Sequence, residues 1–166
     1  MYRKIEDFQS VWSYEASETL KIFNDLTDES LNQKVTETGR SLGFLAWHIV
    51  TTIQEFFGSA GIKIDGVAPE SETPTNVSVI VAEFEKAVKS LNEELPKHWK
   101  DEDLTDEIPM YGETWTKGFT LTCFLMHAAH HRGQMTVLMR QAGLNVHGVY
   151  GPAKEEWEAM GMAALA

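Results

Sequence analysis

Two histidines on one face of a predicted helix are the strongest chemical signal in this sequence. His127 and His131 lie four residues apart, which on an α-helix places them about 40° apart around the axis and about 6 Å along it. Two buried neutral imidazoles need partners for their ring nitrogens, because an unpaired buried polar group costs roughly 1 to 3 kcal/mol. A shared metal ion would be such a partner. The same face carries apolar residues at helical spacing, so we expect the imidazoles to point inward: Leu121, Phe124, Met135 and Leu138.

A third histidine, His48, stands in an earlier apolar segment that should form a central helix. Alone, such a histidine is more often a hydrogen-bonded core residue than a ligand. The pair on the later helix changes this interpretation, because a catalytic metal site typically takes three protein ligands and leaves one position open. Imidazole suits zinc, and also nickel, copper and iron. The sequence therefore predicts one divalent metal site at His48, His127 and His131, with satisfied core histidines as the alternative.

Four long segments would have to position these side chains. Apolar residues recur at helical spacing over about Ile5–Leu26, Leu42–Ala60, Val77–Leu95 and Gly118–Gln141, and Pro96 is expected to end the third helix. A short turn over Asp28–Val35, a hairpin over 108–115 and a last short helix over Lys154–Met160 complete the pattern. We predict a single all-α domain over residues 1–166, a four-helix bundle with a long crossover loop and a short C-terminal extension.

The composition narrows the classes of function. The 166 residues include 14 basic and 25 acidic side chains, a formal net charge of −11, and such a surface repels a nucleic-acid backbone. No segment approaches the roughly 18 unbroken apolar residues of a membrane helix, and no secretory signal follows Met1. Cys123 is the single cysteine, which fits a reducing cytosol. We expect a cytoplasmic protein that binds neither nucleic acid nor membrane.

The motifs around the histidines resemble those of a known family. W-H-I at residues 47–49 and H-A-A-H-H-R-G-Q at residues 127–134 are similar to the DinB/YfiT-like superfamily of metal-binding four-helix bundles, as is R-S-L-G-F at residues 40–44. The likeness extends over most of the chain, although the tail from Gly148 to Met162 lies outside the core motif. It implies that His48, His127 and His131 bind a divalent metal ion, with zinc or nickel as first choices. It also implies a homodimer, since homodimers are common in the family.

The resemblance suggests candidate reactions. Family members with assigned chemistry include transferases and isomerases that use low-molecular-weight thiols such as bacillithiol or mycothiol. A divalent ion acidifies a bound thiol or water, so that either becomes a nucleophile near neutral pH. We therefore expect a metal-dependent enzyme that acts on a small molecule, with thiol-dependent S-transferase chemistry as first choice. A metal-dependent hydrolase and a non-catalytic metal- or small-molecule-binding stress-response protein are the alternatives.

Three residues near the histidines could be either functional or structural. Glu55, two turns after His48, is a candidate general base, although an exposed or salt-bridged carboxylate is the default interpretation. Gln134, one turn beyond His131 on the expected inward side, could orient a metal ligand or form a plain core hydrogen bond. Cys123 could approach the site, yet single buried cysteines are usually inert.

Other residues of the same region are expected to be structural. Arg132 should form a surface or interface ion pair, with an anionic substrate near the cavity as the alternative partner. His130 should face away from the site, and Gly133 should permit close helix packing. His98 and His147 fall in predicted loops and are expected to have no role in the site.

Overall fold

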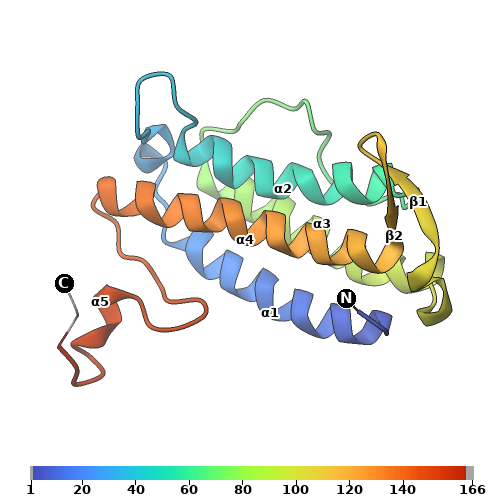
Figure 1. Ribbon diagram of the computed structural model, residues 1–166. Helices are drawn as coiled ribbons and strands as arrows, with labels where there is room; N and C mark the ends of the chain where they lie inside the picture. The colour runs from blue at the N-terminus through green and yellow to red at the C-terminus, as the bar shows by residue number, and fades with distance from the viewer. Residues whose placement is uncertain (1, 164–166) are drawn as a thin grey trace.

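Four main helices and one small hairpin make up most of the fold. The computed structural model describes residues 2–163, with helices α1 (Ile5–Asn24), α2 (Leu42–Ser59), α3 (Val77–His98), α4 (Lys117–Gln141) and α5 (Lys154–Trp157), strands β1 (Glu107–Met110) and β2 (Glu113–Thr116), and 3₁₀ turns η1 (Glu29–Asn32) and η2 (Asp101–Thr105). Figure 1 shows the four long helices as one bundle, with the hairpin at one end and α5 outside it. The predicted helical bundle is confirmed.

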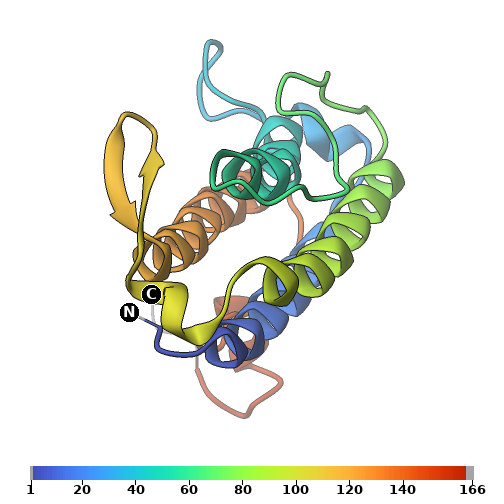
Figure 2. The ribbon, with the colours of Figure 1, turned by 90° about the vertical axis from the view of Figure 1, so that its right-hand side faces the viewer.

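The long helices pack as a ring around an aromatic centre. Helix α2 lies against α3 and α4, and α1 lies against the same two helices, as the end-on view of Figure 2 shows. Trp12 of α1 and Phe124 of α4 meet with ring centroids 5.0 Å apart. The largest side chains with almost no exposed surface lie in this centre: Phe8, Trp12, Phe23, Phe57, Phe84 and Phe124. Burial of so much apolar surface fixes the helices relative to one another.

Hydroxyl caps set the start of the two helices that carry the histidines. The Ser41 hydroxyl accepts a hydrogen bond from the Phe44 backbone N–H at 3.1 Å, and the Thr116 hydroxyl accepts one from Phe119 at the same distance. Each cap satisfies a donor that the first turn of a helix would leave unpaired. Helices α2 and α4 run in opposite directions side by side, so these starting points decide which residues face each other across the groove between them.

Helix α3 does not end at Pro96, so the predicted end of this helix was wrong. The helix continues through Pro96 to His98. Proline has no N–H to donate to the carbonyl four residues earlier, which is that of Asn92. That carbonyl instead accepts a hydrogen bond from the Gln9 side chain of α1 at 2.9 Å. A neighbouring helix thus supplies the missing donor, which a reading of α3 alone could not reveal.

Other boundaries differ by small amounts. Helix α1 ends at Asn24 and not at Leu26, and α5 ends at Trp157 and not at Met160. The residues of α5 are exposed or half-buried, and a helix with little packing is marginal at this length. The hairpin expected over 108–115 is present, with Ile108 paired to Trp115. None of the helices between residues 2 and 163 combines the length and apolar character needed to cross a bilayer.

Candidate metal centre

Three imidazoles converge in the groove between α2 and α4. The Nε2 atom of His127 lies 3.4 Å from Nε2 of His48 and 3.1 Å from Nε2 of His131. One ring nitrogen from each of the three residues falls within a set whose members are all within 4.8 Å of one another. The structure thus brings together the three histidines that the sequence singled out, and this cluster could hold a metal ion.

The spacing of the nitrogens fits a single ion. Nitrogens bonded to zinc at about 2.1 Å and related by a tetrahedral angle would be about 3.4 Å apart. The two observed separations, 3.1 and 3.4 Å, are close to that value. His131 is buried, whereas His48 and His127 are half-buried, so one side of the cluster remains accessible to a small molecule.

The protonation states also suit metal binding. Burial, reinforced by the neighbouring His131, lowers the pKa of His48 and of His127 to about 4. Burial likewise lowers the pKa of His131, against a hydrogen bond to Gln134 that raises it. All three imidazoles are therefore neutral near pH 7, and metal ligation requires the neutral form. Nδ1 of His127 is buried without a hydrogen-bond partner among the described residues, so the polar contacts of this ring lie inside the cluster.

Gln134 fixes the orientation of one of the three rings. Nδ1 of His131 lies 2.8 Å from Oε1 of Gln134, an atom that can only accept, so Nδ1 carries the proton and the Nε2 lone pair faces the cluster. The Gln134 amide nitrogen is 3.1 Å from Nε2 of His130. The Gln134 side chain is exposed at the groove and not in the core, which corrects its expected inward position. His130 is exposed and outside the cluster, as predicted.

A pocket of about 330 Å³ adjoins the cluster on the side of the hairpin. His48 and His127 form one wall, and Glu55 and Cys123 lie in the same pocket with an aromatic and hydroxyl lining of Thr52, Phe56, Tyr111 and Trp115. The structure thus places both Glu55 and Cys123 beside the histidines. Glu55 is half-buried and accepts a hydrogen bond from the Tyr111 hydroxyl at 3.2 Å, so it differs from the exposed carboxylate of the default interpretation.

The hairpin turn brings Tyr111 over this pocket. Tyr111 and Gly112 have φ values of 52° and 82°, the pattern of a two-residue type I′ turn between strands. A left-handed conformation is uncommon for tyrosine. Here the ring packs 5.7 Å from Phe56 and 5.8 Å from Trp115 between ring centroids, and these contacts offset the cost of the turn.

Two titratable residues of the pocket, Tyr111 and Cys123, stay protonated at neutral pH. Burial raises the pKa of Tyr111 to about 12, and the adjacent Glu55 adds to the effect. Burial also raises the pKa of the Cys123 thiol. Tyr111 can therefore donate a hydrogen bond to Glu55, and Cys123 is a half-buried thiol without the thiolate character of a nucleophilic cysteine.

Arg132 lies in a buried polar network that the sequence reasoning missed. Its side chain is 3% exposed and pairs with Glu15 of α1 at 2.6 Å. It also donates to the Thr19 hydroxyl at 2.9 Å and to the Tyr150 hydroxyl at 2.6 Å. The ion pair that we expected therefore exists but is internal. Arg132 lies on the same apolar helix face as Ala128 and Met135. The sequence signal for this ion pair was the acidic Glu15 on the apolar face of another helix.

The remaining predicted residues lie away from the cluster. A Cβ at Gly133 would meet no atom within 4 Å, so the close packing expected there is absent within the described chain. His98 is exposed, with Nε2 3.8 Å from Glu94. His147 contacts Asp25 through Nδ1. Neither histidine contributes to the candidate metal centre.

Comparison with known proteins finds matches over nearly the whole chain. Residues 1–163 match the DinB family model. A Bacillus subtilis strain 168 protein named uncharacterized protein YrdA is 39% identical over 164 residues, 99% of this chain and 98% of that protein.

Two crystal structures are similar to this one. A DinB-like protein from Bacillus cereus ATCC 10987 has a TM-score of 0.86 at 41% identity, covering 90% of this chain and 100% of that one. The DinB-like protein YjoA from Bacillus subtilis has a TM-score of 0.66 at 23% identity, covering 88% and 98%. The second likeness concerns the fold alone.

Removal of Arg132 should be strongly destabilising. Arg132→Met leaves the buried Glu15 carboxylate without its cationic partner, and we expect a loss of about 3 to 5 kcal/mol in the free energy of unfolding. Urea denaturation followed by tryptophan fluorescence measures it. Lys97→Met is the matched control, because the Lys97–Glu94 pair is largely exposed and should be worth at most about 1 kcal/mol. Equal small losses in both variants would show that the Arg132 network contributes little.

Proposed function

Since this chain belongs to the DinB family, we propose that His48, His127 and His131 hold a divalent metal ion in an enzyme that acts on a small molecule. The observation that carries the proposal is the approach of the three ring nitrogens to one point, with separations of 3.1 and 3.4 Å to His127. Zinc and nickel are the ions that we propose first, because imidazole suits both.

We propose thiol-dependent S-transferase chemistry as the reaction. A bound divalent ion would acidify a thiol, or alternatively water, so that it attacks an electrophile near neutral pH. The protein must then hold the thiol and the electrophile beside each other and keep bulk water out. The pocket of about 330 Å³ beside the histidines is large enough for a small organic molecule, and its walls include Phe56, Tyr111 and Trp115.

Glu55 is the residue that we propose as proton acceptor. It lies in the same pocket as His48 and His127, and the Tyr111 hydroxyl holds one of its carboxylate oxygens at 3.2 Å. A carboxylate fixed at the edge of an apolar pocket can take the proton that a thiol or water loses. Gln134 would act as a positioning residue, because it orients His131 and does not face this pocket.

We also propose that the protein is a cytoplasmic homodimer. Helix α4 contains no acidic residue, although the chain carries a formal charge of −11. Met126 of this helix is 59% exposed. A helix face without acidic residues lets two acidic copies approach with less repulsion, and the single cysteine fits a reducing compartment.

The metal site can be tested by elemental analysis of protein purified without a histidine tag. We expect near-stoichiometric metal in the wild type and its loss in His48→Ala and in His127→Ala, because each removes one ligand on a different helix. His130→Ala is the matched control, since His130 is exposed beside the cluster. A wild type that stays empty after incubation with zinc, nickel and manganese would refute the site.

The reaction can be tested with cysteine or bacillithiol as the thiol and 1-chloro-2,4-dinitrobenzene as the electrophile. We expect Glu55→Gln to lower kcat by about 10² to 10⁴-fold, the usual contribution of a general base, with unchanged metal content. Glu107→Gln is the control, because Glu107 is exposed on the hairpin and does not line the pocket. Hydrolysis of 4-nitrophenyl acetate without any thiol transfer would favour the hydrolase instead.

The homodimer can be tested by sedimentation velocity. We expect the wild type to sediment as a dimer and Met126→Glu to sediment as a monomer, because the new charge would be buried in the contact. Val79→Glu places the same charge on α3, where Val79 is 43% exposed, and should leave the dimer intact. A monomeric wild type would contradict the proposal, as would a dimer that Met126→Glu does not affect.

A further inference from the structure

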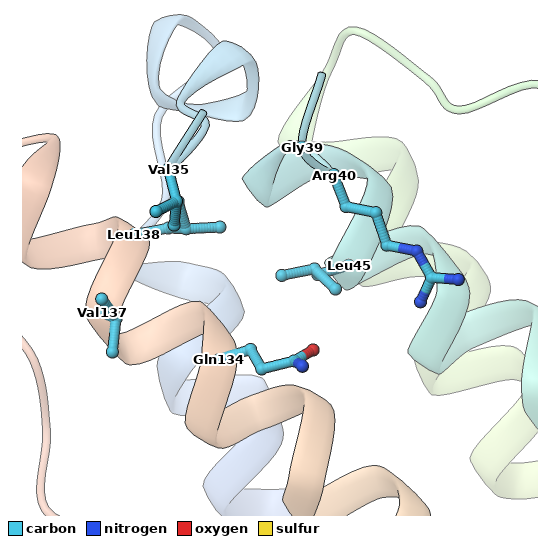
Figure 3. Close-up of a pocket in the computed structure, with 7 residues that line it drawn as sticks. All are labelled: Val35, Gly39, Arg40, Leu45, Gln134, Val137 and Leu138. Carbon is cyan, nitrogen blue, oxygen red and sulfur yellow. The ribbon is translucent and has the colours of Figure 1, made fainter. Parts of the chain in front are cut away.

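A second pocket lies at the other end of the groove between α2 and α4. Its walls are the loop that precedes α2 and the last part of α4, and its volume is about 370 Å³. Figure 3 shows Val35 and Arg40 on the loop, Leu45 on α2, and Val137 and Leu138 on α4. It shares no lining residue with the pocket of Glu55 and Cys123, so the histidine cluster separates two different spaces.

The walls of this second pocket are mostly apolar. Leu45 and Leu138 are only 3% and 2% exposed, whereas Val35 and Val137 are 61% and 51% exposed. The two exposed valines come from different elements, the loop and α4, and Figure 3 draws both on the side away from Arg40. A ligand with a hydrocarbon part would remove both side chains from water, which is favourable in proportion to the apolar area buried.

Arg40 is the charged residue of this lining, and no acid neutralises it. Arg132 and Arg140 pair with Glu15 and Glu155. In contrast, the Arg40 guanidinium lies 5.0 Å above the Phe44 ring, and no carboxylate among residues 2–163 is within ion-pair distance of it. An arginine that stacks on an aromatic ring keeps the N–H donors at its edge available to a planar anion.

Two backbone hydrogen bonds order the loop that carries Arg40. The Leu42 N–H donates to the Gln33 carbonyl at 2.8 Å, and the Gly39 N–H donates to the Thr36 carbonyl at 3.0 Å. A Cβ at Gly39 would lie 2.9 Å from the Thr36 hydroxyl, so only glycine fits this turn without a shift. A loop that is already ordered loses little conformational entropy when a ligand binds.

We propose that this pocket binds a small organic monocarboxylate, with its carboxylate on the Arg40 guanidinium and its hydrocarbon part against Val35 and Val137. The lining offers one positive charge, which matches one carboxylate. A phosphate dianion would need more positive charge than this lining supplies. The amide of Gln134, the other polar group of the wall, is already bonded to His131 and His130. The inference does not depend on a metal ion at the histidines.

The experiment is an NMR titration of the ¹⁵N-labelled protein with hexanoate, with metal removed by EDTA and again after zinc is added. We expect shift changes in residues 35–45 and 134–138 in both preparations. Hexanamide, which has the same chain without the charge, should bind at least about tenfold more weakly, as should hexanoate to Arg40→Gln. Lys34→Gln removes a charge from the same loop outside the lining and should change the affinity less than about twofold.

Val137→Glu gives a second test that leaves Arg40 in place. Val137 is half exposed, so the variant should fold, and the new carboxylate should repel hexanoate and weaken its binding at least about tenfold. Equal binding of hexanoate and hexanamide would overturn the proposal, as would full affinity in Arg40→Gln and Val137→Glu, or shifts confined to other residues. Tighter binding of inorganic phosphate than of hexanoate at these residues would also overturn it.

Discussion

The approach of three imidazoles across one helix–helix groove is the contact on which the rest of the site depends. His48 comes from α2 and the other two histidines from α4, and their nitrogens lie within 4.8 Å of one another. Such an arrangement tolerates little shift of either helix. The hydroxyl caps at Ser41 and Thr116 set where the two helices begin, and Phe56 and Phe57 of α2 pack on Phe124 of α4. The hairpin and the loop before α2 can then form separate pockets at the two ends of the groove.

Two consecutive residues of α4 contact different neighbouring segments. His131 turns toward α2 and the cluster, whereas Arg132 turns toward Glu15 of α1 and Tyr150 of the C-terminal segment. The segment after α4 is therefore bonded to the same helix turn that holds a candidate ligand. Arg140 adds a bidentate pair with Glu155 at 2.8 and 3.0 Å. The tail from Gly148 to Met162, which we expected to lie outside the core motif, falls within the family match and has a structural role, which is to cover one side of α4.

The helices and the histidine cluster could be predicted because each rests on local periodicity. His127 and His131 share a helix face by spacing alone, and His48 stands in an equally clear apolar helix. What depends on a neighbouring element could not be predicted. Helix α3 runs past Pro96 because Gln9 of α1 donates to the freed carbonyl. Gln134 is exposed because α4 borders a groove at this position and not the core. Arg132 is buried because it forms an ion pair with Glu15 of α1. Metal binding, the reaction and the dimer remain predictions.

The buried ion pair has a consequence for the order in which the chain folds. Glu15 lies 117 residues before Arg132 and 135 residues before Tyr150. A contact so distant in sequence closes a long loop, and closing a long loop costs conformational entropy. On the ribosome, α1 therefore emerges with a carboxylate on its inner face and no partner for it until α4 has been made. The bundle can close only after its last long helix has been made, and the histidines of α2 and α4 cannot meet before then.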